Sequence, residues 1–209
     1  MATVRRALQQ DRGAIARLHR EQIPWGLLSN LGPEFVDAFY AVLLRSTVGF
    51  GFVAEQNSRP VGFASGVVNW RRLYVEFLLR RSRIALRGAW MSLRQARLKR
   101  VLETSRYAAD RDLPAAELVA IAVTPEMRGT GVAVALVDEV LNEFRSRGVR
   151  AVRVTTSAEN ERAGALYERS GFRMLARREI HPGHVASVYV ATLDQQDRIG
   201  TANLDRIGG

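Results

Sequence analysis

The feature that most constrains the fold is a strand that runs through a glycine-containing turn into a helix. Residues 116–123, AELVAIAV, are apolar nearly throughout and predict a strand buried on both faces. The turn VTPEMRGTG follows, and apolar residues at helical spacing predict a helix over 132–147 that ends at Gly148. Two glycines at a helix N-terminus let backbone N–H groups face one anion, so this turn is a candidate loop for phosphate oxygens.

The rest of the chain arranges helices and strands around this unit. Strands are expected at 3–8, in a hairpin over 50–70, and at 149–156, 173–180 and 185–193; helices are expected at 9–22, 33–46 and 157–172. This order predicts an α/β (α+β) fold, with a mixed central sheet flanked by helices. We expect residues 1–193 to form one domain and 194–209 to form a flexible tail.

One segment carries most of the excess positive charge. The 209 residues have a formal net charge of +10, and residues 71–106 contain eleven basic and two acidic side chains, so the remainder is close to neutral. We expect this segment to form one broken helix or two. It could pack with solvated arginines against the core or a dimer partner, line an anionic acceptor, or lie on an anionic membrane surface. Nucleic acid is the least favoured partner, because positive charge permits such binding in any protein and is therefore not specific evidence for it.

Absent residue types exclude several chemistries. The sequence contains no cysteine, which excludes disulfides, thiolate metal sites and a cysteine-bound acyl intermediate. The first twenty residues carry charges where a signal peptide needs an apolar core, and no window approaches 18 uncharged apolar residues. We therefore expect a cytoplasmic protein without a metal, at most peripheral to the inner face of the membrane.

Two common phosphate loops do not fit the glycine turn. A nucleoside-triphosphate loop needs a Gly-Lys pair, and the chain has none. A dinucleotide fingerprint needs a third small residue and an acid about twenty residues later. In this chain Val134 stands where the third small residue is needed, and the basic stretch RAVRVT stands where the acid is needed.

Arg128-Gly-Thr-Gly-Val-Ala133 instead resembles the signature R/Q-x-x-G-x-G/A of the GNAT superfamily of N-acetyltransferases. The stretch from Asn160 to Phe172, NERAGALYERSGF, resembles the second motif of that family, N-x-x-A-x-x-L-Y-x-x-x-G-F. The two motifs occur in the family's order, with one helix and one strand between them. The resemblance implies a GNAT-like fold in which 71–106 is a helical insertion, because the family usually has a short connection there.

The resemblance also implies that acetyl-CoA is the acyl donor and that the coenzyme is held mainly by backbone groups. The diphosphate contacts implied are Arg128, Gly129, Thr130, Gly131, Val132 and Ala133. The family places a splayed, bulged strand before the loop, so the groups implied for pantetheine and the oxyanion are those of Ile121, Ala122 and Val123. Asn160 is both an expected helix N-cap and an implied coenzyme contact.

The catalytic residues implied are Tyr167 and Glu117. Tyr167 matches the family tyrosine that hydrogen-bonds the coenzyme sulfur and acts as general acid, although a core tyrosine would fit the same helix. Glu117 resembles the glutamate base of some members; an apolar setting would raise its pKa, whereas a solvated strand edge would leave it without that role. His181 and His184 are alternative bases, and some members use no residue base.

The function implied is direct transfer of an acetyl group from acetyl-CoA to a primary amine of a small acceptor. Anionic and sugar-linked acceptors are among the candidates, and the loop 23–32 lies where the family usually places acceptor contacts. Two alternatives stay open. One is a non-catalytic coenzyme-A-binding module used for sensing or scaffolding, and the other is a membrane-surface N-acyltransferase that uses longer acyl donors.

Overall fold

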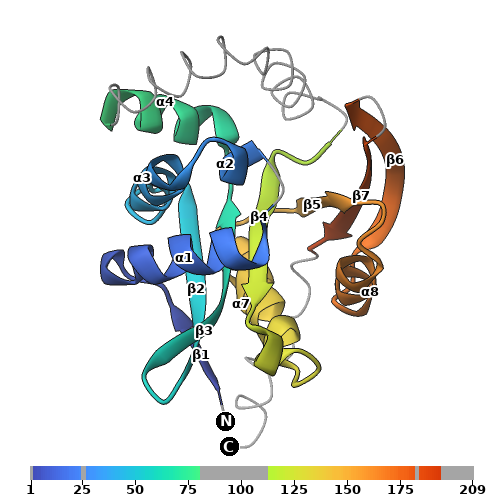
Figure 1. Ribbon diagram of the computed structural model, residues 1–209. Helices are drawn as coiled ribbons and strands as arrows, with labels where there is room; N and C mark the ends of the chain where they lie inside the picture. The colour runs from blue at the N-terminus through green and yellow to red at the C-terminus, as the bar shows by residue number, and fades with distance from the viewer. Residues whose placement is uncertain (1, 25–26, 81–112, 182–183, 194–209) are drawn as a thin grey trace, which may run out of the picture.

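In the part of the chain that the structure describes, seven strands form one mixed sheet in the order β1-β2-β3-β4-β5-β7-β6 (Figure 1). The computed structural model describes residues 2–24, 27–80, 113–181 and 184–193. Neighbouring strands pair antiparallel except for β4 and β5, which are parallel. The strands are β1 Thr3–Arg6, β2 Gly49–Gln56, β3 Arg59–Val67, β4 Ala116–Val123, β5 Ala151–Ser157, β6 Arg173–His181 and β7 His184–Thr192. The predicted mixed sheet and α/β class are confirmed.

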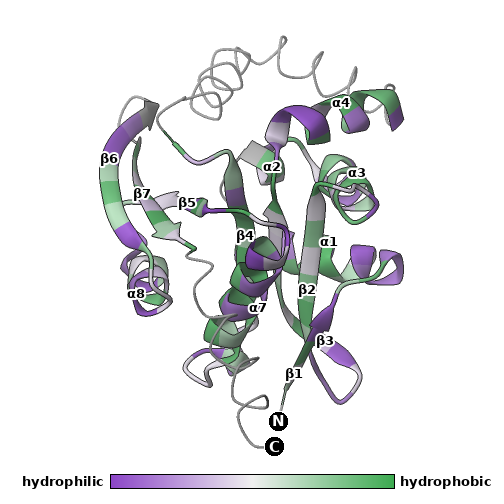
Figure 2. Cartoon of the chain, turned by 180° about the vertical axis from the view of Figure 1, so that it is seen from behind, coloured by the Kyte–Doolittle hydropathy of each residue, from purple (hydrophilic) through white to green (hydrophobic). Residues whose placement is uncertain are grey.

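Helices cover both faces of this sheet. Those of the described chain are α1 Arg12–Gln22, α2 Leu27–Asn30, α3 Pro33–Leu43, α4 Trp70–Arg80, α7 Val132–Ser146 and α8 Glu161–Arg169, with 3-10 turns η1 Gln9–Asp11 and η2 Pro125–Met127. Figure 1 shows α1 on the near face of the sheet, and the reverse view in Figure 2 shows α7 on the other. Figure 2 also shows mainly hydrophobic residues along the central strands and hydrophilic ones at the β2–β3 turn.

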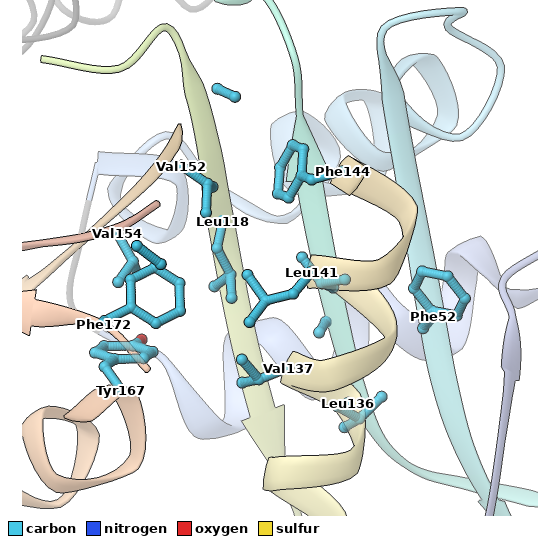
Figure 3. Close-up of a cluster of buried hydrophobic side chains, with 14 of the residues drawn as sticks. Phe52, Leu118, Leu136, Val137, Leu141, Phe144, Val152, Val154, Tyr167 and Phe172 are labelled. Atoms are coloured by element: carbon cyan, nitrogen blue, oxygen red, sulfur yellow. The ribbon is translucent and has the colours of Figure 1, made fainter. Parts of the chain in front are cut away.

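The apolar stripe of α7 builds the core on its face of the sheet. Its buried side chains are Val132, Leu136, Val137, Val140, Leu141 and Phe144. Spacings of three and four residues place them on one side of a helix, against buried strand residues such as Leu118 and Val152 (Figure 3). Gly148, with φ +72°, ends the helix as predicted. The glycine turn therefore leads into a helix whose position is fixed by packing.

Strands β4 and β5 pair only at their beginnings. The register joins Ala116 to Val152 and Glu117 to Arg153, after which β4 continues to Val123 and β5 turns away (Figure 1). Where β4 pairs with β3, a register shift between Ser65 and Gly66 leaves Val119 as an extra residue, which is a β-bulge. We call residues 118–123, on the side away from β3, the open edge of β4. The splayed and bulged strand implied by the family resemblance is confirmed.

Three sequence predictions need correction. Trp70 begins α4 instead of ending a strand, because Asn69 caps the helix by accepting a hydrogen bond from Arg72 N–H (3.1 Å). The predicted loop 23–32 contains α2. Strand β4 alternates between buried and half-buried residues instead of being fully buried on both faces, because successive side chains point to opposite faces and one set is less completely covered.

Of the basic segment 71–106, residues 71–80 belong to α4, and 81–106 lie outside the described residues, as does the predicted tail 194–209. Within the described ranges, no helix is long and apolar enough to cross a lipid bilayer.

Candidate active site

The turn between β4 and α7 has the backbone geometry of an anion-binding loop. After η2, Gly129 and Gly131 adopt φ angles of +76° and +86°. Residues with a Cβ rarely take such angles, whereas an added Cβ would meet nothing within 4 Å at either glycine. The glycines are therefore required by the backbone conformation and not by crowding.

The N-terminus of α7 presents hydrogen-bond donors beside these glycines. Ala135 N–H donates to the Gly131 carbonyl (3.0 Å) and closes the first helical turn. The N–H groups of Val132 and Ala133 precede this bond and have no acceptor within the helix. The positive end of the dipole of this 15-residue helix adds to their attraction for an anion.

The side chains of the loop are engaged elsewhere. Arg128 Nη2 donates to Gln22 Oε1 on α1 (3.1 Å), and Thr130 Oγ1 donates to the Met127 carbonyl (2.7 Å). Both residues are exposed. Their backbone N–H groups are engaged as well, Arg128 with the Pro125 carbonyl (3.2 Å) and Thr130 with the Met127 carbonyl (3.4 Å). Of the predicted diphosphate contacts, Arg128 and Thr130 therefore do not offer a free backbone donor in this structure.

Backbone groups of alternate β4 residues face the open edge. Thr124 N–H donates to the Val61 carbonyl of β3 (2.8 Å), so Thr124 and then Ala122 point their N–H groups toward β3. The N–H and C=O groups of Ile121 and Val123 consequently point the other way. Of the three residues predicted for the pantetheine arm, two have suitable backbone orientation and Ala122 does not.

Tyr167 is a buried residue of α8 in the core cluster that also contains Leu118 of β4. Its side chain is in the core, with the rings of Phe172 and Tyr189 at 5.8 Å and 5.7 Å. Figure 3 shows its hydroxyl on the side of the ring nearer β4. Burial raises the pKa of Tyr167, so the phenol stays protonated at neutral pH and remains a proton donor. A core tyrosine and a general acid are compatible descriptions of this side chain.

Glu117 lies at the last paired position of β4 and β5. Its Oε2 accepts hydrogen bonds from Arg153 Nε (3.0 Å) and Trp70 Nε1 (2.7 Å), and Arg153 Nη2 lies 2.9 Å from the same oxygen as an ion pair. Within the described part of the chain, no hydrogen bond to Oε1 is found, and the Glu117 side chain is 16% exposed. One oxygen of the carboxylate is thus fixed and the other is available.

Arg153 and Trp70 were not among the predicted site residues. Arg153 is 1% exposed between Val152 and Val154, and it lies directly across from Glu117 in the register. A lone arginine within the apolar stretch VRV signals a buried charged partner. The sequence pattern places Trp70 at the end of a strand and therefore gives no sign of its contact with Glu117.

Glu117 and the glycine loop occupy opposite ends of β4. Val123 lies six positions after Glu117, which is about 20 Å of strand. The open edge joins the two ends. The remaining base candidates, His181 and His184, are paired where β6 ends and β7 begins, and their side chains lie outside the described part of the structure.

A family model described as the Acetyltransferase (GNAT) family matches residues 14–172. The chain belongs to the GNAT acetyltransferase family. The matched region includes the glycine loop, Glu117 and Tyr167, so the motifs and the geometry fall within one GNAT domain.

Two curated proteins are similar to this chain over limited lengths. A mycothiol acetyltransferase from Beutenbergia cavernae is 42% identical over 65 residues, which is 31% of this chain and 22% of the relative. An uncharacterized N-acetyltransferase from Methanocaldococcus jannaschii is 28% identical over 134 residues, 64% of this chain and 43% of the relative. The chain therefore spans less than half the length of either curated relative.

The GNAT fold extends over nearly the whole chain. A solved structure described as an acetyltransferase from Salmonella typhimurium with its cofactor acetyl-CoA has a TM-score of 0.61 at 16% identity, covering 94% of this chain and 96% of that one. At this identity the likeness shows the fold alone. Among the described residues, no group of three or more His, Cys, Asp and Glu side chains could hold a metal ion.

Asn160 acts as the N-cap of α8, as predicted: its Oδ1 accepts from Ala163 N–H (3.1 Å). Asn160→Ala is expected to lower the free energy of unfolding by about 1 kcal/mol, because one helix donor loses its acceptor. Asn160→Ser keeps a capping oxygen and should retain nearly all of that stability, measured by urea unfolding. A drop in acetyl-CoA affinity in Asn160→Ser would show a separate coenzyme contact, whereas equal destabilisation of both variants would contradict the capping role.

Proposed function

We propose that the protein transfers an acetyl group directly from acetyl-CoA to the primary amine of a small acceptor. The observation that carries this proposal is the open edge of β4, which connects an anion-binding loop at one end with the half-buried Glu117 carboxylate at the other. Membership in the GNAT family supports the same donor and reaction class.

The coenzyme would be held along β4. Its diphosphate would accept hydrogen bonds from the N–H groups of Gly129, Gly131, Val132 and Ala133, and its pantetheine arm would pair with Ile121 and Val123. The thioester would then lie near the bulge at Val119, where an amide outside the strand ladder can donate to the oxyanion.

The reaction follows from the groups at that end of the strand. A primary amine is protonated at neutral pH, so the acceptor ammonium first gives one proton to Glu117 Oε1, and the nitrogen lone pair then attacks the thioester carbonyl to form a tetrahedral intermediate. The C–S bond breaks, and the sulfur leaves with the electron pair and takes the proton of Tyr167. The second nitrogen proton restores the Tyr167 hydroxyl through solvent, and Glu117 releases the first proton to solvent. The absence of cysteine from the chain fits a single transfer step without a cysteine-bound acyl intermediate.

The rival function is a coenzyme-A-binding module without catalysis. Release of free coenzyme A from acetyl-CoA, followed with a thiol reagent over a panel of primary amines, separates the two. Amine-dependent thiol release supports the enzyme, and tight acetyl-CoA binding without thiol release for any amine contradicts it. The longer-acyl, membrane-surface alternative predicts faster thiol release from long-chain acyl-CoA, together with sedimentation of the protein with vesicles that contain anionic lipid.

Tyr167→Phe tests the proton donor within this function. We expect kcat to fall only about tenfold, because a thiol has a pKa of about 8.5 and its thiolate leaves readily without a proton. The Kd for acetyl-CoA, measured by calorimetry, should change little, since phenylalanine retains the ring packing. An unchanged kcat at every pH from 6 to 9 would reduce Tyr167 to a core residue.

The acceptor does not follow from the relatives. The match to the mycothiol acetyltransferase covers 31% of this chain, so its acceptor is not carried over. The described surface around Glu117 is the better guide.

A further inference from the structure

The first two turns of α4 are held in a fixed orientation beside Glu117. Asn69 caps the helix, and Leu73 and Phe77 on its inner side are buried, with the Phe77 ring 5.1 Å from that of Phe35. Figures 1 and 2 both show α4 at the end of the sheet where β4 begins. Side chains on the flank of this helix therefore have defined directions.

Three aromatic rings are stacked in succession, and the middle one, Trp70, contacts the carboxylate. Trp70 stacks on Phe39 (6.2 Å, 27°) on one side and on Tyr74 (5.3 Å, 26°) on the other. The indole N–H of Trp70 donates to Glu117 Oε2. Phe39 is buried, whereas Tyr74 is 43% exposed, so the last ring of the row offers a surface to a ligand.

The charged groups that act on Tyr74 are Glu117 and its ion-pair partner Arg153. The Arg153 guanidinium is buried and bound to Glu117 Oε2, so it presents no positive surface there. Burial, together with the nearby Glu117 charge, raises the pKa of Tyr74, and Arg153 partly offsets this effect. Tyr74 is consequently a neutral aromatic ring, and its stacking partner Trp70 is hydrogen-bonded to the Glu117 carboxylate.

We infer that Tyr74 and Glu117 Oε1 form the acceptor subsite, and that it selects a cationic primary amine carried on an apolar or aromatic body. The ammonium group lies against Oε1 and the face of the Tyr74 ring, which attracts cations through its quadrupole. Trp70 positions both partners, since it stacks on one and donates to the other. This inference rests on the proposed function, and it replaces the anionic acceptor that the basic segment suggests.

The test compares phenethylamine with ethanolamine and glucosamine 6-phosphate at saturating acetyl-CoA. We expect kcat/KM for phenethylamine to exceed that for the other two at least about tenfold. Tyr74→Ala should raise the KM for phenethylamine about tenfold with kcat nearly unchanged, and Tyr74→Phe should keep the wild-type KM. Leu79→Ala, at a position 78% exposed on the same helix, is the matched control and should change neither constant.

Two results would overturn the inference: an unchanged KM in Tyr74→Ala, or a preference for the sugar phosphate. If acetyl-CoA binds but no amine is acetylated, the proposed function fails and the subsite is tested by equilibrium binding. Calorimetry of phenethylammonium with the coenzyme-loaded protein should then show weaker binding in Tyr74→Ala than in Leu79→Ala, and equal binding would reject the subsite.

Discussion

Replacing Glu117 with glutamine is expected to lower kcat by about 100- to 1,000-fold, because the amide cannot accept the proton of the acceptor amine. The amide oxygen can still accept the hydrogen bonds that Oε2 receives from Arg153 and Trp70, so the side chain should keep its place. The Kd for acetyl-CoA should stay within about twofold, because the diphosphate loop lies about 20 Å away at the other end of β4.

Glu143→Gln is the matched control for this substitution. Glu143 has the same 16% side-chain exposure as Glu117 and is likewise paired with arginine, through Arg147 (2.7 Å) and Arg6 (2.8 Å). It lies near the end of α7, away from the open edge. Each variant removes a half-buried negative charge and should lose up to about 3 kcal/mol of unfolding free energy, but only Glu117→Gln should lose turnover.

Equal kcat values in the two variants would contradict a catalytic Glu117. The residue would then serve only to join β4 to β5 where they part. His181→Gln and His184→Gln would be the next variants to measure, since those histidines are the remaining base candidates. A pH–rate profile on each would show which group titrates in the free enzyme.

The coenzyme half of the site could be predicted from sequence because local rules determine it. The glycines of RGTG require positive φ angles, and the N-terminus of α7 leaves its first N–H groups without acceptors wherever the helix is placed. Asn160 shows the same relation, since its capping role depends on residues three positions apart. Local chemistry is visible in a single sequence.

The acceptor half depends on contacts between distant residues. Trp70 reaches Glu117 over 47 positions of sequence, and Arg153 reaches it over 36. Neither contact follows from periodicity, and both need the parallel register of β4 and β5 and the rotation of α4. The direction of the Ala122 amide likewise depends on its pairing with β3. The available Oε1 and the exposed Tyr74 ring could therefore be found only from the structure.

Replacing Gly131 with alanine is expected to weaken acetyl-CoA binding about 10- to 100-fold, the effect of losing one hydrogen bond to a charged group. Alanine at φ +86° is strained by about 1–2 kcal/mol, so the loop should relax and turn its amides away from the diphosphate. Isothermal titration calorimetry with acetyl-CoA and with pantetheine measures this, because pantetheine lacks the diphosphate and should bind both proteins equally.

Gly171→Ala separates loss of the binding loop from simple backbone strain. Gly171 has nearly the same φ, +87°, and an added Cβ there also meets nothing within 4 Å, but it lies in the turn after α8. Both variants should unfold at similar urea concentrations, while only Gly131→Ala should lose coenzyme affinity. If both lose affinity equally, global destabilisation accounts for the effect; if neither does, the diphosphate does not bind at the glycine loop. Selective loss would place the diphosphate there, because strain of the same size elsewhere leaves binding intact.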